Sequence, residues 1–329
     1  MFQLLILVGL LVTICSSTFL ILWFGMELTV LFFIPFLSRI SSHSTISTMW
    51  QFLMYSVTSS MVFLYSGSVI SSVDLLDWAA WDSVWVHICV FMVVLFKFGF
   101  PPLHGWTLAL VSGMPWFGIF ILGTALKVAP VYILMNLSHS ITDFGVMMPV
   151  WLIFVLWTGV SLSSLVSFSL RHIFVYSSIL SSGWLILSSL SSDTLILSYF
   201  FMYTISLFNL TSLFMNWGVN IVQEISSTGM SVIEKFALVV SLMNLAGLPP
   251  SVGFVVKIAI ISKLVSVSSL LISGLMVLST LFIYNYLQIV MSFYSPNKSM
   301  SVCRFSRMSY MSVFLVTSSL IYPLAFLLV

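Results

Sequence analysis

Four ionisable side chains lie inside long apolar stretches of the sequence: Glu27, Lys97, Lys127 and Lys257. In a bilayer each would cost roughly 2.5–3.5 kcal/mol at the membrane centre. A buried ion pair between Glu27 and one lysine could fix helix packing, but it cannot account for three lysines and one acid. Burial disfavours the charged form of a lysine and a nearby carboxylate favours it. Such lysines could therefore switch between proton-loaded and unloaded states and act as a proton relay.

A histidine, His104, follows the first of two Pro-Pro pairs by two residues. Imidazole titrates near neutral pH, so His104 could join a chain of proton carriers. Alternatively, its ring could bond the backbone carbonyls that a proline-broken helix leaves free. The sequence leaves both interpretations open.

The composition shows which solvent surrounds these groups. Of 329 residues, 60% are hydrophobic and 5% are charged, with a mean hydropathy of +1.20 and a net charge of +2. A soluble domain has about 25% charged residues, so we exclude a soluble enzyme, a secreted domain and a nucleic-acid binder. The length allows about 11 or 12 membrane-spanning helices.

Cofactor motifs are missing from the sequence. Its three cysteines are far apart, whereas an iron–sulfur cluster needs four thiolates, and neither G-x-G-x-x-G nor G-x-x-x-x-G-K-[ST] occurs. We therefore expect no cofactor in this chain. Residues 1–38 contain no Lys or Arg, so we expect them to form structure and not a cleavable leader.

The apolar segments predict an all-α polytopic membrane protein with about eleven spans. A stretch as long as 2–37 must fold back, and we place the turn near Cys15–Ser17. The second span then covers about 18–37. The remaining spans are expected at about 46–67, 84–111, 114–137, 146–165, 171–190, 195–217, 232–263, 270–293 and 308–329.

Two of these spans are interrupted by the same pattern, Gly99-Phe100-Pro101-Pro102 and Gly247-Leu248-Pro249-Pro250. Each interruption falls in the fourth span of a five-span unit, if the units are 1–138 and 139–293. Because five is odd, the second unit would enter the membrane with opposite polarity, which is typical of inverted repeats. Residues 294–329 would add a loop and a C-terminal helix. Two independent proline kinks are the alternative.

Charged loop residues test the number of crossings. With this topology the side of the N-terminus collects Arg39, Arg171, Lys235, Lys298, Arg304 and Arg307, with Glu224 and Glu234. The opposite side collects Asp74, Asp77, Asp82, Asp143 and Asp193, with Lys263 as its basic residue. This asymmetry follows the positive-inside rule and predicts a cytoplasmic or matrix-side N-terminus.

The polar residues also occur in a recognisable series of motifs: Trp23–Leu28, Lys97–His104, Leu126–Pro130, Val175–Ile179, Ala246–Pro250, and Gly253-Phe254 leading to Lys257. In this order and spacing they resemble the antiporter-like subunit 2 family of mitochondrial NADH–ubiquinone oxidoreductase (respiratory complex I). The resemblance implies a subunit that helps to move protons while partner subunits oxidise NADH and reduce quinone. Glu27 would be the acid paired with Lys97, and Lys127 the connecting lysine. Lys257 would be the lysine of the second broken helix, with His104 on the polar axis between them.

The resemblance also implies where the chain works. We expect it in the mitochondrial inner membrane among complex I membrane-arm subunits, neighbouring antiporter-like subunits and lipid. Its N-terminus would face the matrix and its C-terminus the intermembrane space. NADH, FMN, iron–sulfur clusters and ubiquinone would be bound by partner subunits, and no nucleic acid is expected.

Two positions depart from the family pattern. The family often has a histidine where this chain has Ser181, and Pro101 adds a second proline where one is usual. Two other functions stay open: a subunit of a cation/proton antiporter complex, and a helical scaffold that assembles a complex and pumps nothing.

Overall fold

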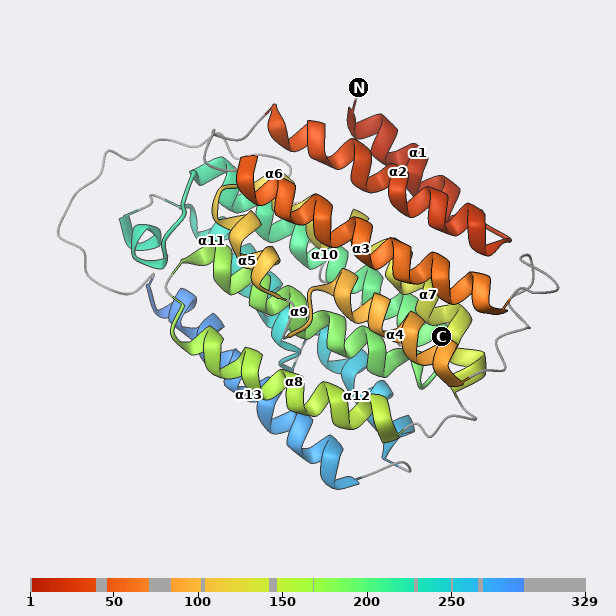
Figure 1. Ribbon diagram of the computed structural model, residues 1–329. Coiled ribbons are helices and arrows are strands. Elements are labelled where there is room, and N and C mark those ends of the chain that lie inside the picture. The colour runs from red at the N-terminus through yellow and green to blue at the C-terminus, as the bar shows by residue number, and fades with distance from the viewer. Residues whose placement is uncertain are drawn as a thin grey trace. The chain divides into compact units, whose positions relative to one another are not determined.

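The computed structural model describes an all-helical chain over residues 2–39, 46–70, 84–101, 104–141, 147–167, 169–227, 230–249, 251–265 and 269–292 (Figure 1). The expected last span at 308–329 lies outside these residues. So do the charged loop residues Asp74, Asp77, Asp82, Asp143, Lys298, Arg304 and Arg307.

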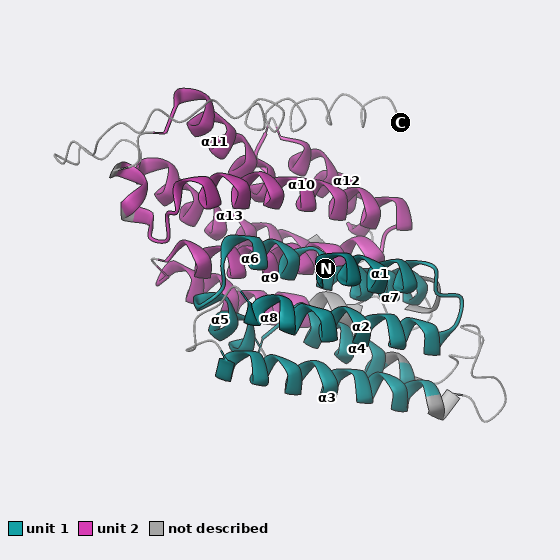
Figure 2. Ribbon diagram, turned by 90° about the horizontal axis from the view of Figure 1, so that it is seen from above, with its two compact units in different colours: residues 1–149 teal, residues 150–329 magenta. Residues whose placement is uncertain are grey.

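The helices fall into two compact units, residues 1–149 and 150–329 (Figure 2). The first unit holds α1 (Phe2–Ile14), α2 (Phe19–Ser38), α3 (Ile46–Ile70), α4 (Val84–Phe98), α5 (Gly105–Ser112), α6 (Trp116–Gly123) and α7 (Ala125–Ile141). The second holds most of α8 (Met147–Leu165) and then α9 (Leu170–Ser189), α10 (Asp193–Trp217), the 3-10 helix Val222–Ser227, α11 (Val232–Ala246), α12 (Val252–Leu264) and α13 (Ser269–Ser292).

Helices form because lipid offers no partner to a free backbone amide or carbonyl, so each segment must satisfy its own. Within the residues that the structure describes, five segments are long and apolar enough to cross a membrane: Phe19–Ser38, Trp116–Leu137, Leu170–Ser189, Asp193–Trp217 and Ile272–Ser292. The chain is thus a multi-pass membrane protein. The predicted turn at Cys15–Ser17 is confirmed, since α1 ends at Ile14 and α2 begins at Phe19.

One expected span differs from the prediction. The segment expected at 114–137 is divided into α6 and α7 at Thr124. The Thr124 hydroxyl donates to the carbonyl of Phe120 at 2.7 Å, a bond that bends helices because it competes with the backbone ladder. The sequence gives no proline or glycine pair here, so the bend was not predicted.

Buried serine and threonine hydroxyls are satisfied within their own helices. In α9, Ser177, Ser181 and Ser188 donate to the carbonyls three residues earlier at 2.8, 2.8 and 2.7 Å. Helix α9 lies at the centre of its unit, because every residue from Ile173 to Ser189 is buried. This bonding pattern lets a serine-rich helix occupy an apolar core without unsatisfied donors.

Glycine allows α1 and α2 to pack closely. A Cβ atom on Gly9 would lie 2.8 Å from Thr29 Cγ2, and one on Gly25 would lie 2.9 Å from the backbone nitrogen of Thr13. Small residues permit such close contact between helices in membranes. The contact fixes the part of α2 that carries Glu27, two residues after Gly25.

This packing predicts that Gly25→Ala destabilises the first unit. The added methyl would meet Thr13 backbone, so α1 and α2 must separate, which we expect to cost about 1–3 kcal/mol. Thermal unfolding in detergent should show a lower midpoint than that of wild type. Gly159→Ala is the matched control, because a Cβ there meets nothing within 4 Å. Equal midpoints for the two variants would contradict the prediction.

Candidate functional site

Both interrupted helices end on a glycine in the left-handed conformation. Gly99 after α4 has φ +71°, and Gly247 after α11 has φ +73°. Gly99 N–H donates to Phe96 O and Phe100 N–H to Leu95 O, each at 3.0 Å. This is the Schellman arrangement, which satisfies carbonyls at a helix end and requires a residue without a Cβ. A proline two residues later prevents the helix from resuming in line.

The second break holds Lys257. This lysine on α12 is 7% exposed. Its Nζ donates to the carbonyl of Ala246 at 2.7 Å and to that of Leu245 at 3.2 Å, both at the C-terminus of α11. The ammonium group also lies over the Trp184 ring, 5.3 Å from its centroid. A cation at a helix C-terminus meets the negative end of the helix dipole, so the end of α11 stabilises the charged lysine.

Two glycines make room for this contact. A Cβ on Gly247 would lie 2.7 Å from Lys257 Cδ and 2.8 Å from Nζ. A Cβ on Gly253, in the first turn of α12, would clash with the carbonyl oxygen of Asn244. The two half-helices therefore come together with backbone against backbone, and Lys257 reaches back across the gap.

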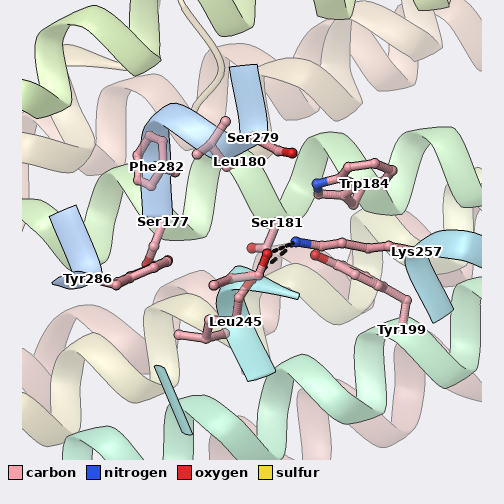
Figure 3. Close-up of a pocket in the computed structure, with 11 residues that line it drawn as sticks. Ser177, Leu180, Ser181, Trp184, Tyr199, Leu245, Lys257, Ser279, Phe282 and Tyr286 are labelled. Atoms are coloured by element: carbon pink, nitrogen blue, oxygen red, sulfur yellow. Dashed lines mark hydrogen bonds between the residues drawn. The ribbon is translucent and has the colours of Figure 1, made fainter. Parts of the chain in front are cut away.

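A small cavity of about 20 Å³ adjoins the Lys257 ammonium group (Figure 3). Its polar lining comes from four helices: Ser177 and Ser181 of α9, Tyr199 of α10, Lys257 of α12, and Ser279 and Tyr286 of α13. A cavity needs about 10–15 Å³ to hold a water molecule, so this one is large enough for water but not for an organic ligand.

The first unit holds the other expected residues. Lys127 on α7 is 3% exposed, and its Nζ lies 5.9 Å from the centroid of the Phe98 ring. Lys97 occupies the last turn of α4 and is half-buried. The carboxylate of Glu27 on α2 is close enough to attract Lys97 electrostatically. Lys127 and the Phe98 ring thus lie together at the first break, and Lys97 precedes Phe98 in the last turn of α4.

The Glu27–Lys97 pair is looser than a salt bridge. Oε1 of Glu27 is buried, and no described residue forms a hydrogen bond with it. A carboxylate oxygen desolvated in this way is costly unless a partner completes its hydrogen bonds. Glu27 and Lys97 thus attract each other, but no hydrogen bond joins them among the described residues.

His104 precedes the first turn of α5, and its side chain makes no capping bond there. Its carbonyl accepts the Thr107 hydroxyl at 2.6 Å. Its Nδ1 is buried and has no hydrogen-bond partner among the described residues. Among the described residues Nδ1 therefore bonds no carbonyl of the break, and the relay interpretation stays a prediction.

The two breaks differ in what lies against their glycine. Thr107 lies against Gly99, where a Cβ would be 2.5 Å from its Cγ2, and Lys257 lies against Gly247. The first break therefore receives a neutral hydroxyl side chain where the second receives a cation. The shared sequence pattern alone does not show this difference.

Several residues of the Lys257 site escaped the sequence analysis: Trp184, Tyr199, Ser279, Tyr286 and the carbonyl of Leu245. Serine and aromatic residues occur throughout the chain, so no local signal distinguishes them. As for metals, the described ranges contain no group of three or more His, Cys, Asp or Glu side chains that could hold an ion.

Comparisons with known proteins agree with this architecture. Residues 16–283 match the family described as NADH:quinone oxidoreductase/Mrp antiporter, TM. NADH-ubiquinone oxidoreductase chain 2 of Anopheles gambiae is 29% identical over 308 residues, covering 90% of this chain and 86% of the relative.

Two solved structures share the fold. One chain of the respiratory complex I of Thermus thermophilus with bound aureothin has a TM-score of 0.81 at 16% identity, covering 98% of this chain and 76% of that one. One chain of the Mrp complex of Dietzia sp. DQ12-45-1b has a TM-score of 0.77 at 17% identity, covering 92% of this chain and 62% of that one. The resemblance of the sequence motifs is confirmed: the chain belongs to the NADH:quinone oxidoreductase/Mrp antiporter transmembrane family.

Proposed function

We propose that this chain is a proton-translocating membrane subunit of an NADH:ubiquinone oxidoreductase. It would move protons along a buried path of Glu27, Lys97, His104, Lys127 and Lys257, joined by water. NADH oxidation and quinone reduction, with FMN and iron–sulfur clusters, would belong to partner subunits. The family and the chain 2 relatives support this assignment.

The observation that carries the proposal is the docking of Lys257 on the broken helix. Two carbonyls and an aromatic ring stabilise the ammonium group at the interruption. If the lysine gives up its proton, the charge-assisted part of these bonds is lost. Proton release would therefore be linked to a change in the contact between α11 and α12, which a proton pump needs if loading and release are to alternate.

The first unit would supply the other end of the relay. Glu27 attracts Lys97 without a hydrogen bond between them among the described residues, so either group could change its protonation state without breaking a tight salt bridge. Lys127, buried against Phe98, would be the connecting lysine of the path. His104, whose buried Nδ1 has no hydrogen-bond partner among the described residues, would be a proton carrier near the first break.

The proposed subunit has eleven spans in two inverted repeats, 1–138 and 139–293, and a C-terminal helix within 294–329. The two left-handed glycines at equivalent breaks are consistent with a repeat. It would lie in the mitochondrial inner membrane with the N-terminus toward the matrix and the C-terminus toward the intermembrane space. Its neighbours would be other membrane-arm subunits, antiporter-like subunits and lipid.

A second candidate function is a subunit of a cation/proton antiporter complex. The family description includes Mrp antiporters, and the fold matches a chain of an Mrp complex. Glu27 and the three lysines would then be ion-exchange residues. The fold and the site residues would be the same for both candidate functions. The identity of the assembly that contains the chain therefore distinguishes the two.

We predict that the chain co-migrates with NADH-oxidising activity. The native membrane would be solubilised mildly, separated on a native gel and stained for NADH oxidation, and the chain identified by mass spectrometry. We expect it in the stained band, because it would depend on redox partners for energy. Migration in an assembly without NADH activity would instead favour the antiporter.

We also predict that Lys127→Met and Lys257→Met uncouple the complex. General acid–base groups contribute about 10²–10⁴-fold to proton transfer, so proton pumping per NADH oxidised should fall by at least about tenfold. The measurement is proton uptake by vesicles that contain the assembled complex. Lys263→Met is the control, because Lys263 is exposed at the end of α12 and donates to Ser192 Oγ at 3.0 Å. Normal assembly with unchanged pumping in both test variants would support a scaffold.

A further inference from the structure

A fully buried tryptophan of the second unit, Trp157 on α8, lies next to the aromatic ring that contacts Lys257. Trp157 is 0% exposed and Trp184 on α9 is 3% exposed. Their ring centroids are 5.5 Å apart and their planes are inclined at 56°, which is within the range of favourable aromatic pairs. The Trp184 ring in turn lies 5.3 Å from Lys257 Nζ, and Figure 3 shows the two side chains together. The three side chains form a continuous series from α8 through α9 to α12.

A glycine of α9 makes room for the Trp157 ring. A Cβ on Gly183 would lie 2.5 Å from Cε2 and from Cζ2 of Trp157 and would also clash with its Nε1. Glycine permits such close contact between helices in membranes. The Trp157 ring therefore packs on the backbone of α9 at the residue directly before Trp184, and a side chain at position 183 would displace it.

Other contacts attach α8 to its unit without Trp157. The Asn285 side-chain amide of α13 donates to Ser164 Oγ of α8 at 2.9 Å. A Cβ on Gly274 of α13 would lie 2.6 Å from Cε2 of Phe154 on α8, so this ring also packs closely against a glycine. Because these contacts are independent of Trp157, a change of that side chain should leave α8 in place.

The orientation of the Trp184 ring decides whether it can hold a cation. An ammonium group is attracted to the face of an indole ring and not to its edge. The χ2 torsion of tryptophan has broad minima, so the side chain does not fix the direction of its own ring face. A neighbour that packs against the ring can supply that restraint, and Trp157 packs against it.

We propose that Trp157 is a positioning residue for Lys257 and acts through Trp184. Packed on Gly183, it holds the Trp184 ring toward the ammonium group and so keeps the charged lysine at the end of α11. Trp157 is not among the residues that line the cavity at Lys257, which fits an indirect role. The inference rests on the proposed proton translocation and adds a residue to the lysine's support.

Two variants remove the restraint in different ways. Trp157→Leu removes the ring, whereas Gly183→Ala displaces it and leaves both tryptophans in the chain. Each should lower proton pumping per NADH oxidised about tenfold, the factor that corresponds to loss of a desolvated cation–π contact. Trp50→Leu, on a 60% exposed tryptophan of α3, and Gly159→Ala, where a Cβ meets nothing within 4 Å, are the matched controls and should pump as wild type does.

The conservative variant Trp157→Phe tests whether the ring is what matters. It keeps an aromatic ring against Trp184, so it should recover most of the pumping that Trp157→Leu loses. Assembly of each variant is checked on the native gel. If the phenylalanine and leucine variants assemble and pump equally, or if Gly183→Ala pumps as wild type does, the positioning role is wrong.

The pH profile of pumping separates positioning from packing. Trp157→Leu, Gly183→Ala and Trp184→Leu remove the same contact to the lysine, so their pH midpoints should differ from that of wild type by equal amounts. A packing defect would lower the rate and leave the midpoint unchanged, which would contradict the proposal. The other titratable side chains that line the cavity at Lys257 stay the same in all three variants: Tyr199 of α10 and Tyr286 of α13.

A density map of the wild-type complex in lipid gives a test that does not depend on variants. The Trp184 ring should face Lys257 Nζ with the Trp157 ring packed against it. A Trp184 ring turned away from the lysine, or separated from Trp157, would overturn the proposal.

The outcomes distinguish this inference from the function on which it rests. If Lys257→Met stops pumping while Trp157→Leu and Gly183→Ala keep the wild-type rate and midpoint, the positioning role is wrong and the proposed function stands. If Lys257→Met pumps normally, the proposed function falls, and a role of Trp157 in pumping falls with it.

Discussion

Inside a bilayer no water completes the hydrogen bonds of the backbone, and this constraint governs both the fold and the candidate site. Continuous helices meet the constraint within themselves. An interruption does not, because the last carbonyls of the first half-helix lose their amide partners. At the second break Lys257 supplies the missing donors to Leu245 and Ala246. A lysine ammonium group thus supplies the hydrogen bonds that the interrupted helix α11 lacks at its C-terminus.

The same contact gives the lysine two roles that compete. As a cap, Lys257 is best protonated, because charged donors bond carbonyls more strongly than neutral ones. As a proton carrier, it must at times be neutral. Thr107, which lies against Gly99 at the first break, has no such conflict. The two breaks therefore share a left-handed glycine, and at the second break a titratable side chain, Lys257, lies directly against that glycine.

Serine makes the surroundings of Lys257 polar without making them unstable. The serine hydroxyls of α9 donate to carbonyls of their own helix, as those of Ser177 and Ser181 do. The core therefore gains acceptor oxygens and no unsatisfied donors. A histidine at position 181 would fill space and could carry a proton itself. Ser181 lines the small cavity beside Lys257.

The sequence by itself determined the features that depend on local chemistry: apolar segments long enough for a membrane, the turn after Ile14, and the two Gly-x-Pro-Pro interruptions. It also singled out Glu27, Lys97, His104, Lys127 and Lys257, whose roles as proton carriers remain predictions. Tertiary structure decided the docking of Lys257 on Ala246 and the cavity with Tyr199. The cavity needs side chains from helices far apart in sequence, and apolar helices of similar composition carry no local signal of which neighbours they will meet.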